Sequence, residues 1–179
     1  MEIIIIILLI LLNGLFAMSE IALISARRSN LTARAKQGNK AAAKALQLAQ
    51  DPDRFLSTIQ IGITLIGILT GIYSGEALAG RFGAMLASLG MPLRTAVPVA
   101  QILIVIVVTY LTIVFGELVP KRIGMKSAER VAILVARPMQ VLAKVTSPFV
   151  WLLSRSTELI TRLLGIRDTE SKVTEEEIK

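Results

Sequence analysis

The sequence feature that most constrains this chain is an uncharged run from Thr95 to Gly116, which ends in the sequence Gly-Glu-Leu-Val-Pro-Lys. A run of this length crosses the hydrocarbon core of a bilayer as an α-helix. A carboxylate at Glu117, a proline at Pro120 and two consecutive cations follow at once. The chain is therefore expected to fold around a membrane-spanning helix that has polar groups at its end.

Pro120 predicts a local break in this helix, because a proline has no amide hydrogen and its ring collides with the carbonyl four residues earlier. That carbonyl belongs to Gly116, so the sequence predicts a free backbone oxygen beside the Glu117 carboxylate. Two such oxygens at the edge of the hydrocarbon can bind a hard cation. The alternative is that Pro120 only ends the helix and that Glu117 pairs with Lys121 one turn on.

Composition places the chain among membrane proteins and restricts its chemistry. Apolar residues make up 54% of the chain and aromatic residues 4%, and the mean hydropathy is +0.68, which is not typical of a soluble globule. The chain has no Cys and no His, so thiolate and imidazole metal ligands and the common nucleophile–base pairs are excluded. Any bound metal must be held by oxygen atoms. The net charge of +7 with few aromatics favours loops that face anionic lipid over nucleic-acid binding.

Three segments are long and apolar enough to span a bilayer, at about residues 3–25, 55–76 and 96–118. The region 26–54, which contains a predicted helical linker at 27–53, carries seven cations against two acids. The loop after the second span carries two cations against one acid. By the positive-inside rule the linker is cytoplasmic, the N-terminus is outside and the C-terminus is cytoplasmic. We therefore predict an all-α membrane protein with three transmembrane helices.

Each predicted span carries polar residues near its inner end. In the first span Asn13 and Glu20 share one helical face, and Ser19 lies beside it. Because the first and third spans run inward and the second starts inside, their polar groups are expected at one depth. Oxygen atoms at that depth predict an inward-facing cation site between the helices. The candidate site residues are Asn13, Ser19, Glu20, Gln60, Thr64, Gly116 and Glu117.

The second span also carries a face of small residues. Gly67, Gly71 and Gly75 repeat at four-residue steps, a spacing that lets another helix approach closely. We interpret these glycines as a helix-packing seam that can serve as a dimer contact.

The segment 127–165 does not have the pattern of a span. Its cations recur every seven residues among apolar ones, at Arg130, Arg137 and Lys144. This pattern predicts amphipathic helices that lie along the cytoplasmic leaflet as a juxtamembrane belt. Pro138 and Pro148 are expected to divide the belt into short helices. The alternative is a re-entrant or fourth span within residues 131–153.

Three motifs occur in order along the chain. They are Asn13-Gly14-Leu15-Phe16 through Ser19-Glu20-Ile21-Ala22-Leu23, then Thr58-Ile59-Gln60-Ile61-Gly62, then Gly116-Glu117-Leu118-Val119-Pro120-Lys121. Together they resemble the transmembrane domain of the CorC and cyclin M (CNNM) family of magnesium- and sodium-associated transporters, which includes bacterial members labelled hemolysin-like. The resemblance implies that residues 1–165 form the transmembrane domain and that 166–179 form a linker.

The resemblance also implies a homodimer in a bacterial inner (plasma) membrane. It further implies a cytosolic pair of cystathionine-β-synthase-type (CBS) repeats after residue 179, and ATP is expected only on that part. Thr174 and Glu177 have the spacing of a capping box, so a helix is expected to begin where the sequence stops. We therefore expect this sequence to be a fragment from which the cytosolic CBS domain is missing.

In the relatives that this chain resembles, a dehydrated magnesium ion lies between the helices. It is held by the motif glutamate, a backbone carbonyl and Ser or Asn side chains, and Glu117 matches that glutamate. Ala17, Ile63 and Gly67 stand where the relatives commonly have Ser or Asn, which removes neutral oxygens. A divalent ion asks for about six oxygens, so this site must recruit other side chains, keep water or serve another cation.

The function that the resemblance implies is magnesium efflux in exchange for sodium. Glu117 is the expected charged ligand, Gly116 the carbonyl ligand and Glu20 a second carboxylate. One alternative is export of another cation, such as a polyamine. A second alternative is a membrane anchor and dimerisation module for the cytosolic CBS domain. The expected partners are a second copy of the chain, membrane lipid and a metal ion; an enzyme is not expected.

Overall fold

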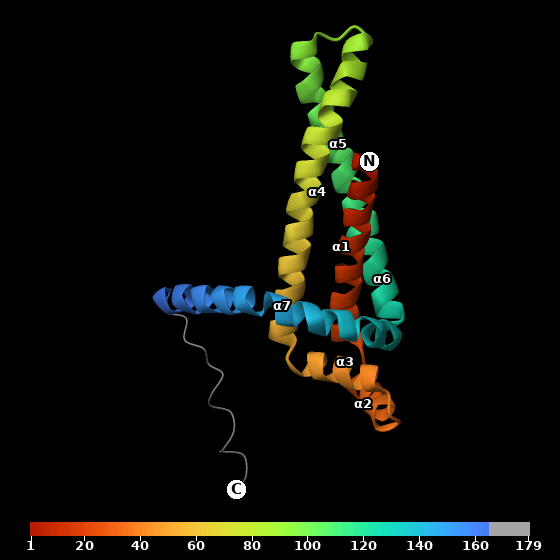
Figure 1. The fold of residues 1–179 in the computed structure, drawn as a ribbon, viewed down its shortest axis with the longest axis vertical. Helices are drawn as coiled ribbons and strands as arrows, with labels where there is room; N and C mark the ends of the chain where they lie inside the picture. Colours follow the sequence, from red (N-terminus) through yellow and green to blue (C-terminus); the bar gives the residue numbers. More distant parts are fainter. Residues whose placement is uncertain (165–179) are drawn as a thin grey trace.

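The computed structural model describes residues 1–164, except for the side chains of Arg54, Glu76 and Ala77. The predicted linker 166–179, with its capping box, lies outside the described residues. The elements, shown in Figure 1, are α1 (Glu2–Ser25), α2 (Arg28–Lys36), α3 (Lys40–Gln50), α4 (Pro52–Ser88), α5 (Leu93–Ile113), the π-helical turn η1 (Val114–Leu118), α6 (Val119–Lys126) and α7 (Ala128–Leu163).

Three helical segments are long and apolar enough to cross a membrane: Glu2–Ser25, Phe55–Ser88 and Leu93–Lys126. In Figure 1 they run along the long axis of the molecule as α1, α4 and the continuous rod of α5, η1 and α6. Many of their large apolar side chains are exposed, as a helix in lipid requires. The predicted all-α fold with three apolar spans is confirmed.

The second span is longer than predicted, because α4 continues to Ser88 instead of ending near residue 76. The predicted outer loop shrinks to residues 89–92, with the turn at Gly90, whose φ is +101°. Gly83 lies inside α4 and not in this loop, and a Cβ there would lie 2.9 Å from Val97 Cγ2. The glycine instead lets α4 and α5 pack closely, and their hairpin projects beyond the start of α1 (Figure 1).

The predicted break at Pro120 takes the form of η1, and the helix does not end there. The Val119 amide donates to the Val114 carbonyl, five residues back, so the backbone hydrogen bonds shift to π-helical spacing. Pro120 then lies in the first turn of α6, where the structure tolerates its missing amide hydrogen. The third span therefore continues to Lys126.

The juxtamembrane segment is a single helix, and the prediction that Pro138 and Pro148 divide it is wrong. A proline within a helix leaves the carbonyl four residues earlier without its usual amide partner. Both prolines lie on the exposed side of α7, so these carbonyls are not buried among packed side chains. In Figure 1, α7 runs across the lower ends of α1 and α4 and not alongside them. The fourth-span alternative is therefore not supported.

The hydrophobic core lies at this lower end, where α7 and the linker helices meet the spans. The linker forms α2 and α3, and the Asn39 side chain caps α3 by accepting hydrogen bonds from the amides of Ala41 and Ala42. Buried core residues from these elements include Leu23, Leu31, Phe55, Ile59, Val135 and Met139. This core fixes the lower ends of α1 and α4 in Figure 1, and most of the predicted site residues lie on these two helices.

Candidate functional site

The predicted site is built where α1 packs against η1 and α6. A Cβ on Gly14 would lie 2.8 Å from Pro120 Cγ and 2.9 Å from the Phe115 carbonyl oxygen, so only a glycine permits this approach. At the same crossing Asn13 Nδ2 donates a buried hydrogen bond of 2.9 Å to the Gly116 carbonyl. The prediction that this carbonyl is left without a partner is therefore wrong. A carbonyl oxygen has two lone pairs, so the bond from Asn13 does not by itself use its full capacity to accept.

Two carboxylates from different helices share one ammonium group beside this crossing. Lys121 Nζ lies 2.9 Å from Glu117 Oε1 and 3.7 Å from Glu20 Oε2. The side chains of Lys121, Glu117 and Glu20 are 33%, 48% and 25% exposed, so the cluster is open to solvent or to a partner. The pairing of Glu117 with Lys121, which the sequence left open as an alternative, is present, and Glu20 joins it; the other half of that alternative is wrong, because the helix does not end at Pro120. We call Glu20, Glu117 and Lys121 the carboxylate–lysine cluster.

The structure does not bring the remaining candidate residues into this cluster. The Ser19 hydroxyl is buried and donates to the Leu15 carbonyl of its own helix at 2.6 Å. Gln60 and Thr64 are exposed on α4, and no hydrogen bond among the described residues joins them to α1 or η1. Within residues 1–164, no three acidic, His or Cys side chains gather in a group that could hold a metal ion. The role of Ser19, Gln60 and Thr64 as cation ligands stays a prediction.

Sequence reasoning missed Thr58 and the full role of Lys121. Thr58 is completely buried on α4 and its hydroxyl lies 3.4 Å from that of Thr146 on α7. Its place in the second motif was the available signal, since it lies two residues before Gln60. For Lys121 the spacing from Glu117 was visible, but its contact with Glu20 depends on how α1 and α6 pack.

The glycine face of α4 is not covered by another helix of the described part of the chain, residues 1–164. A Cβ on Gly67, Gly71 or Gly75 would meet no atom within 4 Å. Gly67 and Gly71 border a cavity of about 190 Å³ between α4 and α5, which is also lined by Thr109 and Thr112. The predicted use of this face as a dimer contact stays a prediction.

Asn13→Ala is expected to destabilise the fold modestly. It removes the buried hydrogen bond that joins α1 to η1, and such bonds between membrane helices contribute about 0.6 kcal/mol on average and about 1.7 at most. Chemical unfolding in detergent should therefore show a loss within this range. Thr161→Ala is the control, because that exposed hydroxyl bonds only within α7. An equal loss in both variants would contradict a special role for Asn13.

Comparison with known proteins places the chain in a family. The family described as the cyclin M transmembrane N-terminal domain matches residues 4–179. UPF0053 protein sll0260 of Synechocystis sp. is 47% identical over 180 residues, which cover 100% of this chain and 40% of that protein. UPF0053 protein YhdT of Bacillus subtilis is 31% identical, over 96% of this chain and 38% of that protein.

A third relative carries a functional name. The polyamine export protein of Escherichia coli (strain K12) is 33% identical over 92% of this chain and 37% of that protein. The chain thus spans 37–40% of the length of these relatives. With the family match running from residue 4 to the last residue, and with three apolar spans in the structure, the chain belongs to the cyclin M transmembrane domain family.

Proposed function

We propose that this chain is the membrane domain of a cation transporter whose cargo binds at the carboxylate–lysine cluster. The observation that carries the proposal is the pair of carboxylates from two helices, Glu20 and Glu117, on either side of one ammonium. Ionisable groups within membrane segments are costly and commonly mark ion pathways. The π-helical turn beside Glu117 is also a feature that is frequent at functional sites.

In this proposal Lys121 is a resident counter-ion that the cargo replaces. The cluster holds two negative charges and one positive charge, so displacing the lysine leaves both carboxylates for the incoming cation. Lys121 stands four residues after Glu117 on the same rod, and it returns to the carboxylates when the cargo leaves. The two carboxylates are therefore never left without a cation within the membrane segment, where an uncompensated charge is costly.

Magnesium is the first candidate cargo, with sodium as the exchanged ion. Glu117 and Glu20 supply charged oxygens, and the Gly116 carbonyl, which also accepts from Asn13, supplies a neutral one. Mg²⁺ usually keeps several waters and binds one or two protein carboxylates. The oxygen-only donor set therefore fits a partly hydrated magnesium ion in transit.

A polyamine is the second candidate cargo, and one contact in the structure favours it. Lys121 Nζ is a primary ammonium, the same group that ends a polyamine, and it already sits between both carboxylates. The Escherichia coli relative named polyamine export protein has the same domain. A polyamine could therefore replace Lys121 without a change in the kind of hydrogen bond that the carboxylates accept.

The proposed setting is a bacterial inner membrane, with the N-terminus outside and α2, α3 and α7 on the cytoplasmic side. Cations concentrated between residues 26 and 54 support this orientation. A homodimer is proposed as the assembly, because the face of Gly67, Gly71 and Gly75 is open to a second copy. If the chain instead served only as an anchor and dimerisation module, substitutions on this glycine face would impair its function and substitutions of the two carboxylates would not.

Flux measurements in liposomes test the proposal. Protein-dependent movement of magnesium or of radiolabelled putrescine is expected, and the cation that moves is expected to raise the unfolding temperature in detergent, since ligands stabilise the state that they bind. Competition between the two cations for this stabilisation identifies the cargo. If neither cation moves and neither stabilises the protein, the transporter proposal fails and the anchor alternative is preferred.

A further inference from the structure

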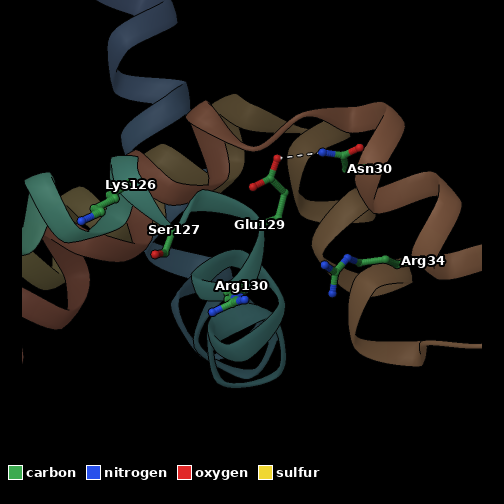
Figure 2. Close-up of a pocket in the computed structure, with 6 residues that line it drawn as sticks. All are labelled: Asn30, Arg34, Lys126, Ser127, Glu129 and Arg130. Atoms are coloured by element: carbon green, nitrogen blue, oxygen red, sulfur yellow. Dashed lines mark hydrogen bonds between the residues drawn. The ribbon is translucent and has the colours of Figure 1, made fainter.

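A second cavity lies away from the carboxylate–lysine cluster, where α2 lies beside the junction of α6 and α7. Its volume is about 370 Å³, which is within the range of small-molecule sites. Figure 2 shows the residues that line it, which come from all three helices. They are Asn30, Arg34, Lys126, Ser127, Glu129 and Arg130.

Positive charge dominates this cavity, and no ion pair within residues 1–164 neutralises it. Arg34, Lys126 and Arg130 are exposed, and none of them takes part in the ion pairs formed within residues 1–164. Three cations therefore line one cavity against a single carboxylate, at Glu129. Guanidinium groups that line a cavity without an ion-pair partner are typical of sites that bind phosphate.

The single carboxylate is already committed to another partner. Asn30 Nδ2 donates a hydrogen bond of 3.0 Å to Glu129 Oε1, and Figure 2 shows the carboxylate turned toward Asn30. This hydrogen bond is the main cause that holds the pKa of the Glu129 carboxyl below its usual range. Glu129 therefore stays ionised at neutral pH and ties α7 to α2, which fixes the walls of the cavity.

We propose that this cavity binds the phosphate group of an anionic ligand. Arg34 and Arg130 can each offer two parallel N–H donors to phosphate oxygens, and Lys126 adds a point charge. The Ser127 hydroxyl, which makes no cap hydrogen bond to α7, is a further donor. The site does not depend on which cation the chain transports.

Two sources offer this phosphate group: an anionic lipid headgroup and a soluble phosphate. The position favours the lipid. The cavity opens at the N-terminal end of α7, whose exposed side chains include Leu134, Val141, Val145 and Phe149. A helix with exposed apolar side chains and cations lies at the level of the headgroups of a cytoplasmic leaflet.

The test titrates short-chain phosphatidylglycerol into the detergent-purified protein and follows the unfolding midpoint, with short-chain phosphatidylcholine as the zwitterionic comparison. Phosphatidylglycerol is expected to raise the midpoint. The Arg34→Gln/Arg130→Gln double variant is expected to bind it at least about tenfold more weakly, because two charge-assisted hydrogen-bond donors are lost. A parallel titration with inorganic phosphate, against chloride at equal ionic strength, reports on the soluble source.

Lys36→Gln/Lys40→Gln is the matched control, because these exposed cations flank the nearby turn, do not line the cavity and change the net charge equally. Binding in the control is expected to stay within about threefold of the original, since only general attraction changes.

Arg34→Lys/Arg130→Lys keeps the charge but loses the paired donors, so an intermediate affinity supports the site even if the glutamine variant folds poorly. If inorganic phosphate raises the unfolding midpoint, and the arginine variants weaken its binding while the control does not, the cavity binds a soluble phosphate and not a lipid headgroup. Equal losses in test and control variants, or binding of neither phosphate source, would overturn the proposal.

Discussion

Glu117→Gln is expected to reduce cation flux in liposomes by about 10- to 100-fold while the protein stays folded. The variant keeps the shape of the side chain but removes the charge that the cargo must pair with. A hydrogen bond to a charged group contributes about 1.5–3 kcal/mol, which corresponds to that range. The ion pair with Lys121 is half exposed, so its loss should cost the fold about 1 kcal/mol or less. Wild-type flux in this variant would remove the carboxylate from the mechanism.

Lys121→Met separates a transport role of Glu117 from a structural one. Methionine has a similar length but no charge, so the two carboxylates lose their resident cation while the helix is kept. If Lys121 competes with the cargo, the apparent affinity for the cargo should rise, and the KM for flux should fall. If Glu117 only holds Lys121 in place, Lys121→Met should instead reduce flux as strongly as Glu117→Gln does.

Gly124→Leu is expected to destabilise the folded protein by about 3 kcal/mol or more, at the upper end of overpacking costs. Gly124 is buried where α6 crosses α1, and a Cβ there would lie 2.5 Å from Ile21 Cγ2 and 2.7 Å from the Met18 carbonyl oxygen. The side-chain atom can rotate away, but the backbone oxygen cannot, so α1 and α6 must separate. Thermal unfolding in detergent measures the loss.

Gly80→Leu is the matched control for this effect. Gly80 is also a helical glycine, on α4, but it is exposed and a Cβ there meets nothing within 4 Å. Because leucine is a better helix former than glycine, this variant should be as stable as the original or slightly more stable. A Gly124→Leu protein with an unchanged unfolding midpoint would contradict the close crossing of α1 and α6.

The spans could be predicted because hydropathy and helix length act locally along the chain. Residues 3–25 needed no knowledge of neighbours, and α1 occupies almost that range. The end of the second span was less predictable, because charge at Glu76 and Arg81 suggested a loop while packing against α5 keeps α4 helical to Ser88. A local charge pattern does not show which helix lies alongside.

In the candidate site, too, a contact within one helix could be predicted from the sequence, and contacts between helices could not. The Glu117–Lys121 contact follows from four-residue spacing on one helix, so the sequence already contained it as an alternative. The partner of the Gly116 carbonyl is Asn13, which is 103 residues away, and no local rule connects the two. The same limit applies to Glu20, which reaches Lys121 only because Gly14 and Gly124 let α1 and α6 pack closely.

The length of α7 has a mechanical consequence. Its buried residues end at Val150, and from Trp151 onward nearly every side chain is exposed as the helix extends past the bundle (Figure 1). The packed part of α7, from Ala128 to Val150, and its exposed part belong to one continuous helix, so both move together when the helix moves as a unit. The packed part begins at Ala128, directly after Ser127 and α6, the helix that carries Lys121. A partner that binds the exposed part of α7 therefore binds a helix that is joined, through Ser127, to α6 and to the lysine that pairs with the two carboxylates.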